Sequence, residues 1–580
     1  MMISPARPFL EPQTSRQRKY EALRACFVER IPVPDVARRF GYTAGTLHVM
    51  CSKFRRQPSV DFLFPPPSAP ASEAPPPAFR RAALQAKIVA LRKQNLSIYD
   101  IAAALKHDGT PLTPVMVGRI LSAEGFAKLP RRGDEERMQH ASVIKAEVAN
   151  AEALDLTPRT LHTKFGGLFL FLPILARIPL TKILAEARLP GTKMVPPLQA
   201  VLSLLGLKLF GNARTSHIMS HVLDEGLALF AGLNAIPKRS FLTEYSCRIQ
   251  PDAYPVWMRH WFDAVNKIGL RRDSSFDLDF HTIPFHGEDA LVEKHYISKR
   301  SRQQKGLLAF LARDADQDVF CYANAEIRKA DQNDEILRFV EFWKARTERP
   351  PEELVFDSRL TTYENLGKLN QMGIRFITLR RRSAKMLQQV HARPLSAWRR
   401  IELPNLARQY RTPRILDEQL VLRDYPGEIR QITIADLGHE EPTVLITNQF
   451  RLSPVALITR YAQRMIIENK IAEGIDFFHM DALTSAVAMK VNCDLQLTLM
   501  ASSIYKLLAC RLGNGYENAR ARTVFRDIID TTATIHIAEH DITVRFQKRA
   551  HNPHLLSAGF ATEEIRVPWL GNRRLNLAFG

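Results

Sequence analysis

The chain has 580 residues, with 81 Lys and Arg against 60 Asp and Glu, and 46% of its residues are hydrophobic. This length accommodates about three to five domains, and the composition argues against wholesale disorder. Six cysteines without a CxxC pair argue against a disulfide scaffold and a cysteine-rich zinc module, so a reducing compartment fits best.

The chain is strongly basic, with a formal net charge of +21 and a pI near 9.8. Basic surface gains free energy by releasing counterions from a polyanion, so this charge favours a polyanionic partner. The most apolar run, Gly166–Ala176, is well short of the ~20 residues that a membrane span needs, and the N-terminus lacks an apolar signal segment. We expect a soluble, cytoplasmic protein with no membrane partner; a membrane-surface role for the charge is the least favoured alternative.

A proline-rich linker, residues 61–79, separates two N-terminal segments of similar design, residues 16–60 and 80–132. Each segment shows short helical stretches, a turn and a capped last helix, which is the sequence outline of a helix-turn-helix. Thr43 is the expected cap in the first segment, and Thr113 with Pro114 starts the last helix of the second.

Residues 1–140 hold 22 Lys and Arg against 12 Asp and Glu. Either helical segment alone is equally well explained as a packing unit without a ligand. Two basic segments in tandem favour binding to double-stranded DNA. The candidate contacts on these segments are Thr43, His48, Lys53 and Arg119.

In the remaining chain the spacing of apolar residues changes from a helical to a strand period near residue 271. Residues 150–270 are expected to form a helical packing domain without chemistry, and residues 271–510 a mixed sheet with helices on its faces. Residues 511–580 form a C-terminal region of undefined role. Within 271–510 the expected strands are 275–283, 306–313, 319–325, 353–357, 374–379 and 443–448. The expected helices are 333–347, 361–372 and a long one over 454–473. Residues 380–440 are expected to form an irregular insertion.

Acidic residues at strand ends are candidate site residues, because a carboxylate there lies beside a cleft rather than in the core. Asp279 belongs to an alternating strand, Asp357 ends a short apolar strand, and Glu468 lies in the long helix. Three carboxylates at one sheet edge would suit Mg²⁺, which prefers oxygen ligands. Asp277 remains an alternative to Asp279, and Glu473 to Glu468.

Two further residues accompany Glu468 on its helix. Tyr461, Arg464 and Glu468 are spaced i, i+3 and i+7, so they share a helical face. Arg464 is placed either to orient a carboxylate or to bind a phosphate in a bidentate manner. Separately, the basic stretch that includes Lys299, Arg300 and Arg302 is either a DNA contact or a solvated loop. The histidines show no tight zinc spacing.

The segment Leu354–Thr378, with its strand, Asp357 and the following Gly-Ile-Arg-Phe-Ile-Thr, resembles the region of the second aspartate in DDE transposases of bacterial insertion sequences. The segment Tyr461-Ala-Gln-Arg464-Met-Ile-Ile-Glu468 is similar to their Tyr-x2-Arg-x3-Glu signature, and Asp279 would match the first aspartate. One departure is that Ile475 stands where the family pattern often has a lysine, seven residues after the glutamate.

The resemblance implies a ribonuclease-H-like catalytic domain at 271–510, with a β-rich insertion at about 380–440. It implies that Asp279, Asp357 and Glu468 are catalytic and bind Mg²⁺, with Mn²⁺ able to replace it, and that Tyr461 and Arg464 contact DNA. The implied reaction is cleavage at transposon ends and strand transfer to target DNA, by a homo-oligomer acting on the bacterial nucleoid.

Two rival functions remain open from the sequence. The first is a catalytically inactive or domesticated DNA-binding regulator derived from a transposase, which would bind DNA in a salt-sensitive manner without metal-dependent cleavage. The second is a nuclease of the same fold that performs no strand transfer.

Overall fold

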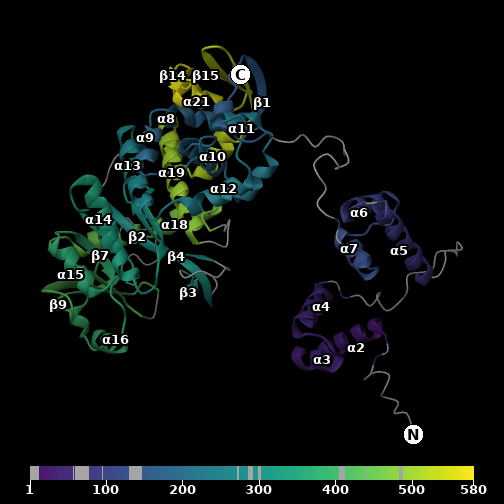
Figure 1. The fold of residues 1–580 in the computed structure, drawn as a ribbon. Helices are drawn as coiled ribbons and strands as arrows, with labels where there is room; N and C mark the ends of the chain where they lie inside the picture. The colour runs from purple at the N-terminus through teal and green to yellow at the C-terminus, as the bar shows by residue number, and fades with distance from the viewer. Residues whose placement is uncertain are drawn as a thin grey trace, which may run out of the picture. The chain divides into compact units, whose positions relative to one another are not determined.

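The computed structural model describes residues 14–56, 77–94, 96–127, 147–270, 274–284, 292–297, 302–358, 360–403, 412–438, 441–481 and 488–580, with the single residues 12, 58 and 129. The chain divides into two compact units, Met1–Ser142 and Val143–Gly580. The expected linker at 61–79 lies almost entirely outside the described residues. Each unit is therefore considered by itself (Figure 1).

The first helical group of the smaller unit contains α2 (Ser15–Phe27), α3 (Val33–Phe40) and α4 (Ala44–Arg56). Leu23, Val36 and Leu47, one from each helix, are almost fully buried in a shared core. Gly41 ends α3 with φ +69°, a conformation that glycine adopts without steric cost. Thr43 caps α4 as expected, because its Oγ1 accepts from the backbone N–H of Thr46 at 3.2 Å.

The second group contains α5 (Pro77–Lys93), α6 (Ile98–His107) and α7 (Pro114–Ala123). Ser97 and Asp100 form a reciprocal capping box at the start of α6. Thr113 caps α7, with Pro114 as its first residue. The expected caps are therefore confirmed, and the two groups share the same three-helix plan.

The larger unit begins with a helical layer over residues 150–270. Its helices are α8 (Leu172–Leu175), α9 (Leu180–Glu186), α10 (Pro197–Leu209), α11 (Glu225–Phe230), α12 (Arg239–Tyr245) and α13 (Ala253–Lys267), with 3-10 turns η3 (Ala151–Ala153), η4 (Gly166–Phe171), η5 (Thr215–Ser220) and η6 (Ser246–Arg248). The apolar run that begins at Gly166 is buried in this layer. Among the described residues no single helix is long and apolar enough to cross a membrane, although the bent pair Gly166–Leu175 and Leu180–Glu186 passes that test together.

The central element is a mixed sheet, with ten strands in the described part of the chain. They are β2 (Ser275–Pro284), β3 (Glu293–Ile297), β4 (Arg302–Asp314), β5 (Val319–Ile327), β6 (Glu353–Phe356), β7 (Arg375–Leu379), β8 (Arg399–Arg400), β9 (Arg414–Val421), β10 (Glu428–Ala435) and β11 (Thr443–Thr447). Their order is β3-β4-β2-β6-β7-β11-β10-β9-β8, and β5 also pairs with β4. The expected mixed sheet is thus present.

Strand directions divide this sheet into two parts. β2, β4 and β5 pair antiparallel, whereas β6 lies parallel to both β2 and β7. Parallel neighbours need crossover connections, and α14 (Glu335–Thr347) and α15 (Tyr363–Gln371) supply them. Both helices pack on the face that carries Leu354 and Phe356. The opposite face carries Val355, which packs against Leu457 of α17 (Pro454–Gln463).

The region 380–440 contains strands, as the expected β-rich insertion implies, but these strands are regular and continue the same sheet. It contains α16 (Ala384–His391) and the antiparallel strands β8, β9 and β10, with residues 404–411 outside the described part. β10 pairs with β11, which in turn pairs with β7. Arg430 of β10 joins this region to the segment before α17, because it binds Asp417 at 2.9 Å and donates to the carbonyl of Leu452 at 2.6 Å.

The Asp417–Arg430 pair predicts a pH-dependent stability. Hydrogen bonding to Arg430 lowers the pKa of Asp417, so the folded state binds a proton less readily than the unfolded chain. The pair therefore stabilises the fold above the unfolded pKa of ~3.9, and this contribution is lost as the pH falls through the lowered value. Asp417→Asn should weaken hydrogen-exchange protection of β9 and β10 by about 1.5–3 kcal/mol at pH 7. A difference from wild type that stays constant down to pH 2 would contradict the ionic origin.

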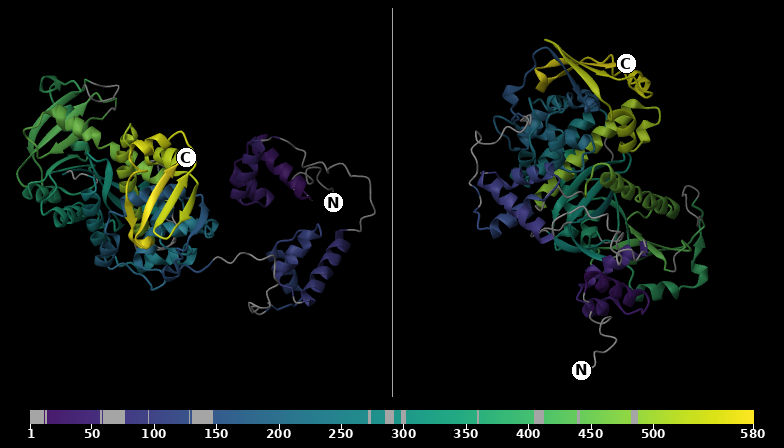
Figure 2. Two further views of the ribbon diagram at one scale, coloured as in Figure 1. Left: turned by 90° about the horizontal axis from the view of Figure 1, so that it is seen from above. Right: turned by 90° about the vertical axis from the view of Figure 1, so that its right-hand side faces the viewer.

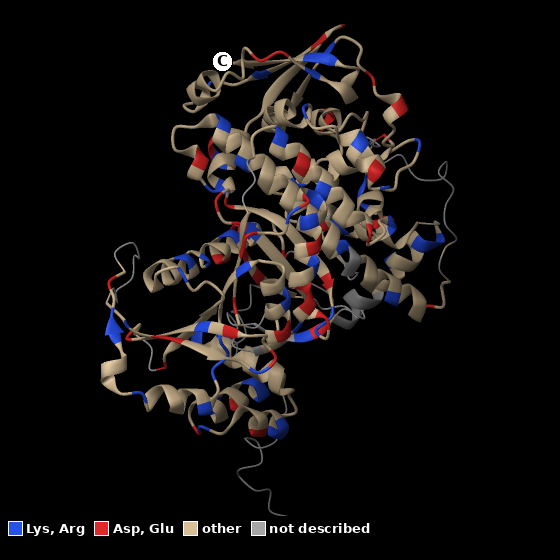
Figure 3. Ribbon diagram, turned by 90° about the vertical axis from the view of Figure 1, so that its left-hand side faces the viewer, with Lys and Arg blue, Asp and Glu red and all other residues tan. Residues whose placement is uncertain are grey.

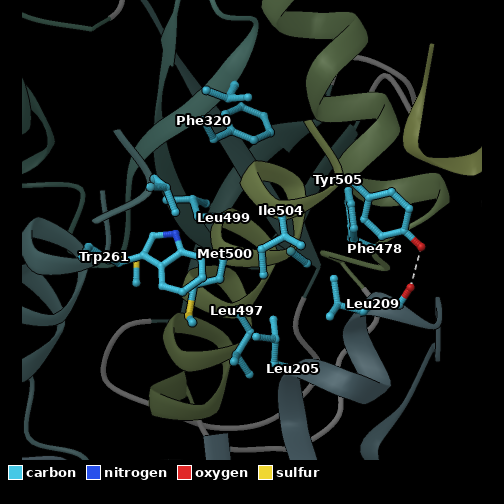
Figure 4. Packing of buried hydrophobic residues seen from close by; sticks show 14 of the residues in the cluster. Leu205, Leu209, Trp261, Phe320, Phe478, Leu497, Leu499, Met500, Ile504 and Tyr505 are labelled. Atoms are coloured by element: carbon cyan, nitrogen blue, oxygen red, sulfur yellow. Dashed lines mark hydrogen bonds between the residues drawn. The ribbon is translucent and has the colours of Figure 1, made fainter. Parts of the chain in front are cut away.

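The C-terminal residues are integral to the larger unit. Helix α19 (Ala488–Leu512) packs against α10, α13 and β5. Figure 4 shows Leu497 and Met500 of this helix near Trp261 and Leu205, and Ile504 on the side of Tyr505, whose hydroxyl donates to the carbonyl of Leu209 at 2.6 Å. This helix thus ties the sheet to the helical layer.

A second sheet includes a strand from the segment 150–270, which was expected to form a helical packing domain. β1 (Arg159–Thr163) pairs with β12 (Ala533–Ile537), and the order in the described residues is β1-β12-β13-β15-β14. The remaining elements are β13 (Asp541–Phe546), β14 (Ile565–Val567), β15 (Arg573–Phe579), α20 (Ala521–Val524), the π-helical turn η11 (Phe525–Ile529), α21 (Asn552–Ser557), and the 3-10 turns η8 (Gln332–Asp334), η9 (Leu395–Ala397), η10 (Tyr516–Asn518) and η12 (Pro568–Leu570). The left view of Figure 2 shows this sheet in yellow beside the blue helical layer.

Candidate functional site

Strand register brings the first two candidate carboxylates together. The parallel pairing of β2 with β6 sets Asp277 opposite Val355 and Leu278 opposite Phe356. Continuing this register by one residue sets Asp279 opposite Asp357, on strands that lie about 4.8 Å apart. Because successive residues of a strand alternate between faces, both carboxylates belong to the face that α17 covers. Asp279 accepts from its neighbour's backbone, the N–H of Phe280, at 2.8 Å.

Asp357 stands where β6 ends and the chain turns toward α15. Its Oδ1 accepts from the backbone N–H of Ser358 at 2.5 Å, which fixes the carboxylate at the turn. The side chain is half-buried, whereas the four strand residues before it are fully buried. The strand end therefore exposes one carboxylate at the edge of an apolar core.

The expected long helix over 454–473 is broken into α17 and α18 (Ile466–Asp476). At the break the N–H of Arg464 bonds to the carbonyl of Tyr461, and that of Met465 to Ala462, both with the tighter i to i+3 spacing of a 3-10 turn. Glu468 consequently lies in the first turn of α18 rather than in mid-helix. A carboxylate in a first turn is favoured by the helix dipole.

Arg464 links the two halves of the site. Its Nη1 donates to Asp279 Oδ2 at 3.3 Å, and its Nη2 lies 3.6 Å from Glu468 Oε1. The guanidinium also lies over the Tyr461 ring, 5.5 Å from the centroid. Although Arg464 is only 7% exposed, Glu468 is exposed to solvent. Asp279, Glu468, Tyr461 and Arg464 are therefore brought together, as the sequence predicted.

Asp357 interacts electrostatically with two residues of this group. Burial raises the pKa of Asp279 to about 6; Arg464 and the Phe280 N–H oppose this, while Glu468 and Asp357 add to it. Burial likewise raises the pKa of Tyr461 to about 12, with Asp357 among the carboxylates that add to the effect. Glu468 and Asp357 thus both repel the Asp279 carboxylate, which is a condition that a bound cation relieves.

The two alternative carboxylates have structural roles. Asp277 is fully buried and binds Arg313 at 2.5 Å and Arg460 at 2.8 Å. Glu473 binds Lys470 at 2.8 Å and accepts from the backbone N–H of Ala521. Both side chains are buried within these ion pairs, whereas Asp279 and Glu468 keep 21% and 54% of their side chains exposed beside Arg464, which favours them as site residues.

The residue types at this site suit a hard divalent cation, because all three are carboxylates. Their arrangement is more open than a closed metal centre: among the described residues, no group of three or more His, Cys, Asp or Glu side chains stands close enough to hold a metal ion. The Arg464 guanidinium lies between Asp279 and Glu468 and neutralises part of their charge.

The other candidate DNA contacts are distributed differently. His48 and Lys53 on α4 and Arg119 on α7 are exposed, whereas the Thr43 hydroxyl is engaged in capping α4. Lys299 and Arg300 lie outside the described residues, and Arg302 begins β4, so at least this end of the basic stretch is strand rather than loop. In the view of Figure 3, basic and acidic residues intermix over the larger unit.

Sequence reasoning missed one set of site-supporting residues. Arg460 binds Asp277 and Glu353, each at 2.8 Å, and Ser275 at 2.9 Å, so it fastens α17 to both β2 and β6. Glu353 also accepts from Gln449 at 3.0 Å. The position of Asp277, on the same face of β2 as Asp279, could have indicated a basic partner such as Arg460, because a buried carboxylate requires a cation.

Known proteins resemble this chain only in solved structures, and not at the level of protein families. No protein-family model matches the chain, and no curated protein matches it. A solved structure of the piggyBac transposase synaptic complex with hairpin DNA is similar over 64% of this chain and 80% of that one, with 10% sequence identity and a TM-score of 0.35. A TM-score of this size leaves the relationship at a partial likeness of shape.

Proposed function

We propose that this chain is a DDE-type DNA transposase that binds the ends of an insertion sequence and catalyses Mg²⁺-dependent DNA cleavage and strand transfer. The observation that carries the proposal is that Arg464 connects Asp279 to Glu468. The register of β2 and β6 supports it, because it ends at Leu278 opposite Phe356 and leaves Asp279 and Asp357 as the next residues of the two strands. The strand order β5-β4-β2-β6-β7, with the last two parallel to β2, supports a ribonuclease-H-like catalytic domain.

Each part of the chain has a role in this proposal. Asp279, Asp357 and Glu468 would hold Mg²⁺, or Mn²⁺ in its place, which would activate the attacking oxygen and stabilise the leaving one. Arg464 and Tyr461 orient a phosphate of the substrate strand. In the reaction, water attacks the phosphodiester and releases a 3′-hydroxyl, and that hydroxyl later attacks target DNA.

The smaller unit would grip the duplex through α4 and α7, whose outer faces carry His48, Lys53 and Arg119. Its charge, 22 Lys and Arg against 12 Asp and Glu over residues 1–140, is denser than that of the remaining chain. Two element ends must be paired for strand transfer, so we expect a homo-oligomer on DNA, acting at the bacterial nucleoid.

An assay for joined products tests this function. A labelled duplex with the sequence that flanks the coding region is incubated with plasmid, protein and Mg²⁺. We expect nicks at the element boundary and label joined to plasmid, and EDTA should remove both, because the carboxylates alone cannot activate a nucleophile. Nicks without joined label would support a nuclease instead of a transposase.

One observation favours the inactive DNA-binding regulator as a second candidate: a guanidinium, rather than a cation site, lies between Asp279 and Glu468. A regulator would bind the same duplex in a salt-sensitive manner, and it would give neither nicks nor joined label in Mg²⁺ or Mn²⁺.

A further inference from the structure

A cavity of about 470 Å³ lies beside the segment that follows Asp357, on the opposite face of β6. Its floor is formed by neighbouring strands, with Phe356 from β6, Thr378 from β7 and Ile446 from β11. Tyr363 at the start of α15 and Arg381 after β7 form its sides. The cavity therefore opens at the carboxyl ends of two parallel strands, where open α/β sheets bind their ligands.

The cavity contains a buried polar group that has no partner. Thr378 is 2% exposed, and its hydroxyl makes no hydrogen bond to any described residue. The side-chain oxygen of Asn333, which lines the same cavity, is also buried without a hydrogen-bond partner among the described residues. A buried hydroxyl without a partner costs free energy, so these groups indicate a ligand that carries hydrogen-bonding groups.

The wall of the cavity that α15 and Arg381 form suits a phosphate. The nine-residue helix α15 starts there, with Thr362 as its cap, and the first turn of a helix offers N–H groups to an anion. Arg381 Nε donates to the carbonyl of Ser358 at 3.2 Å, which holds its guanidinium next to the segment that carries Asp357. Two carboxylates also line the cavity, but Glu364 is paired with Lys368 at 3.0 Å and Asp424 lies 3.8 Å from Arg423.

We infer that this cavity binds one nucleotide of the substrate DNA strand. Arg381 and the first turn of α15 hold its phosphate, and its sugar or base enters the cavity and bonds to Thr378 and Asn333. The volume lies within the ~300–1,000 Å³ of small-ligand pockets and exceeds what a phosphate alone needs. The inference rests on the proposed action on DNA, since it places a strand across the sheet edge beside Asp357.

Mononucleotide binding tests the inference, because a single nucleotide offers no duplex for α4 and α7 to bind. The full chain is titrated by calorimetry, in a phosphate-free buffer, with each deoxynucleoside 5′-monophosphate and with inorganic phosphate. We expect saturable binding of at least one nucleotide, and weaker binding of phosphate. Arg381→Gln should weaken the nucleotide at least ~10-fold, because a charge-assisted contact is lost. Thr378→Val, which keeps the side-chain shape, should weaken it roughly fivefold.

Arg382→Gln is the matched control, because it removes the same charge from the adjacent exposed residue, which does not line the cavity. It should leave the affinity within ~2-fold of wild type. Equal losses in Arg381→Gln and Arg382→Gln, inorganic phosphate binding as tightly as every nucleotide, or no saturable binding would each overturn the inference.

The outcome can be separated from that of the proposed function. Asp279→Asn should lose DNA cleavage and keep Arg381-dependent nucleotide binding, because Asp279 lies on the other face of the sheet. If wild type cleaves DNA but binds no nucleotide, only the cavity inference fails. If nucleotide binding depends on Arg381 while no cleavage occurs, only the proposed function fails.

Discussion

Replacing Asp357 by Asn should abolish Mg²⁺-dependent nicking of element-end DNA, with a rate at least ~10³-fold lower than wild type. The amide has nearly the same shape as the carboxylate but lacks the charge that attracts a divalent cation. The acceptor bond from the Ser358 N–H, at 2.5 Å, is retained by the amide oxygen, so the turn should persist. Duplex binding, measured by gel shift, should be unchanged because the proposed duplex contacts lie on the smaller unit.

Asp316→Asn provides the control for this experiment. Asp316 lies exposed in the turn between β4 and β5, so the substitution removes one carboxylate from the same sheet without touching the site. Nicking by this variant should equal that of wild type. Unchanged nicking in Asp357→Asn would reject the assignment of Asp357.

Arg460→Met should destabilise the larger unit by about 3–5 kcal/mol, because removing one partner leaves buried charge without compensation. Arg460 binds both Asp277, which is 0% exposed, and Glu353, which is 8% exposed. Arg313 would still bind Asp277, but Glu353 would lose the one cation that pairs with it among the described residues. Urea unfolding followed by tryptophan fluorescence measures the change.

Arg451→Met is the matched substitution, since Arg451 is exposed before α17 and its loss should cost less than ~0.5 kcal/mol. The loss of unfolding free energy in Arg460→Lys should lie between those of Arg460→Met and Arg451→Met. Lysine keeps the charge but cannot bind three acceptors with the planar geometry of arginine. A cost below ~1 kcal/mol for Arg460→Met would show that the network does not fasten α17 to β2 and β6.

The sequence predicted most strands and caps because their signals are local. Alternation predicted β2, a short apolar run predicted β6, and Thr43 and Thr113 each cap a helix as their side chains indicate. The site residues were also predictable in part: Asp357 follows the end of β6 as expected, whereas Asp279 lies in the middle of β2, which continues to Pro284. Their adjacency needed the parallel register of β2 and β6, which no local pattern encodes.

The differences from expectation come from tertiary structure. The break between α17 and α18 leaves the apolar period nearly unchanged, so a straight helix and a broken one give the same pattern. β1 pairs with β12 at the other end of the chain, and its five residues resemble a connection between helices when they are considered alone. The sequence around Arg460 gives no sign of its role, because its carboxylate partners come from β2 and β6, which are neighbours in the sheet but far from Arg460 in sequence.

The most direct measurement is anomalous diffraction from crystals of the full chain with element-end DNA and Mn²⁺. The account predicts a manganese peak shared by Asp279 and Asp357, with oxygen ligands about 2.1 Å away, and Arg464 turned from Glu468 toward a DNA phosphate. A DNA-bound crystal in which Arg464 still joins Asp279 to Glu468, with no manganese beside them, would contradict it.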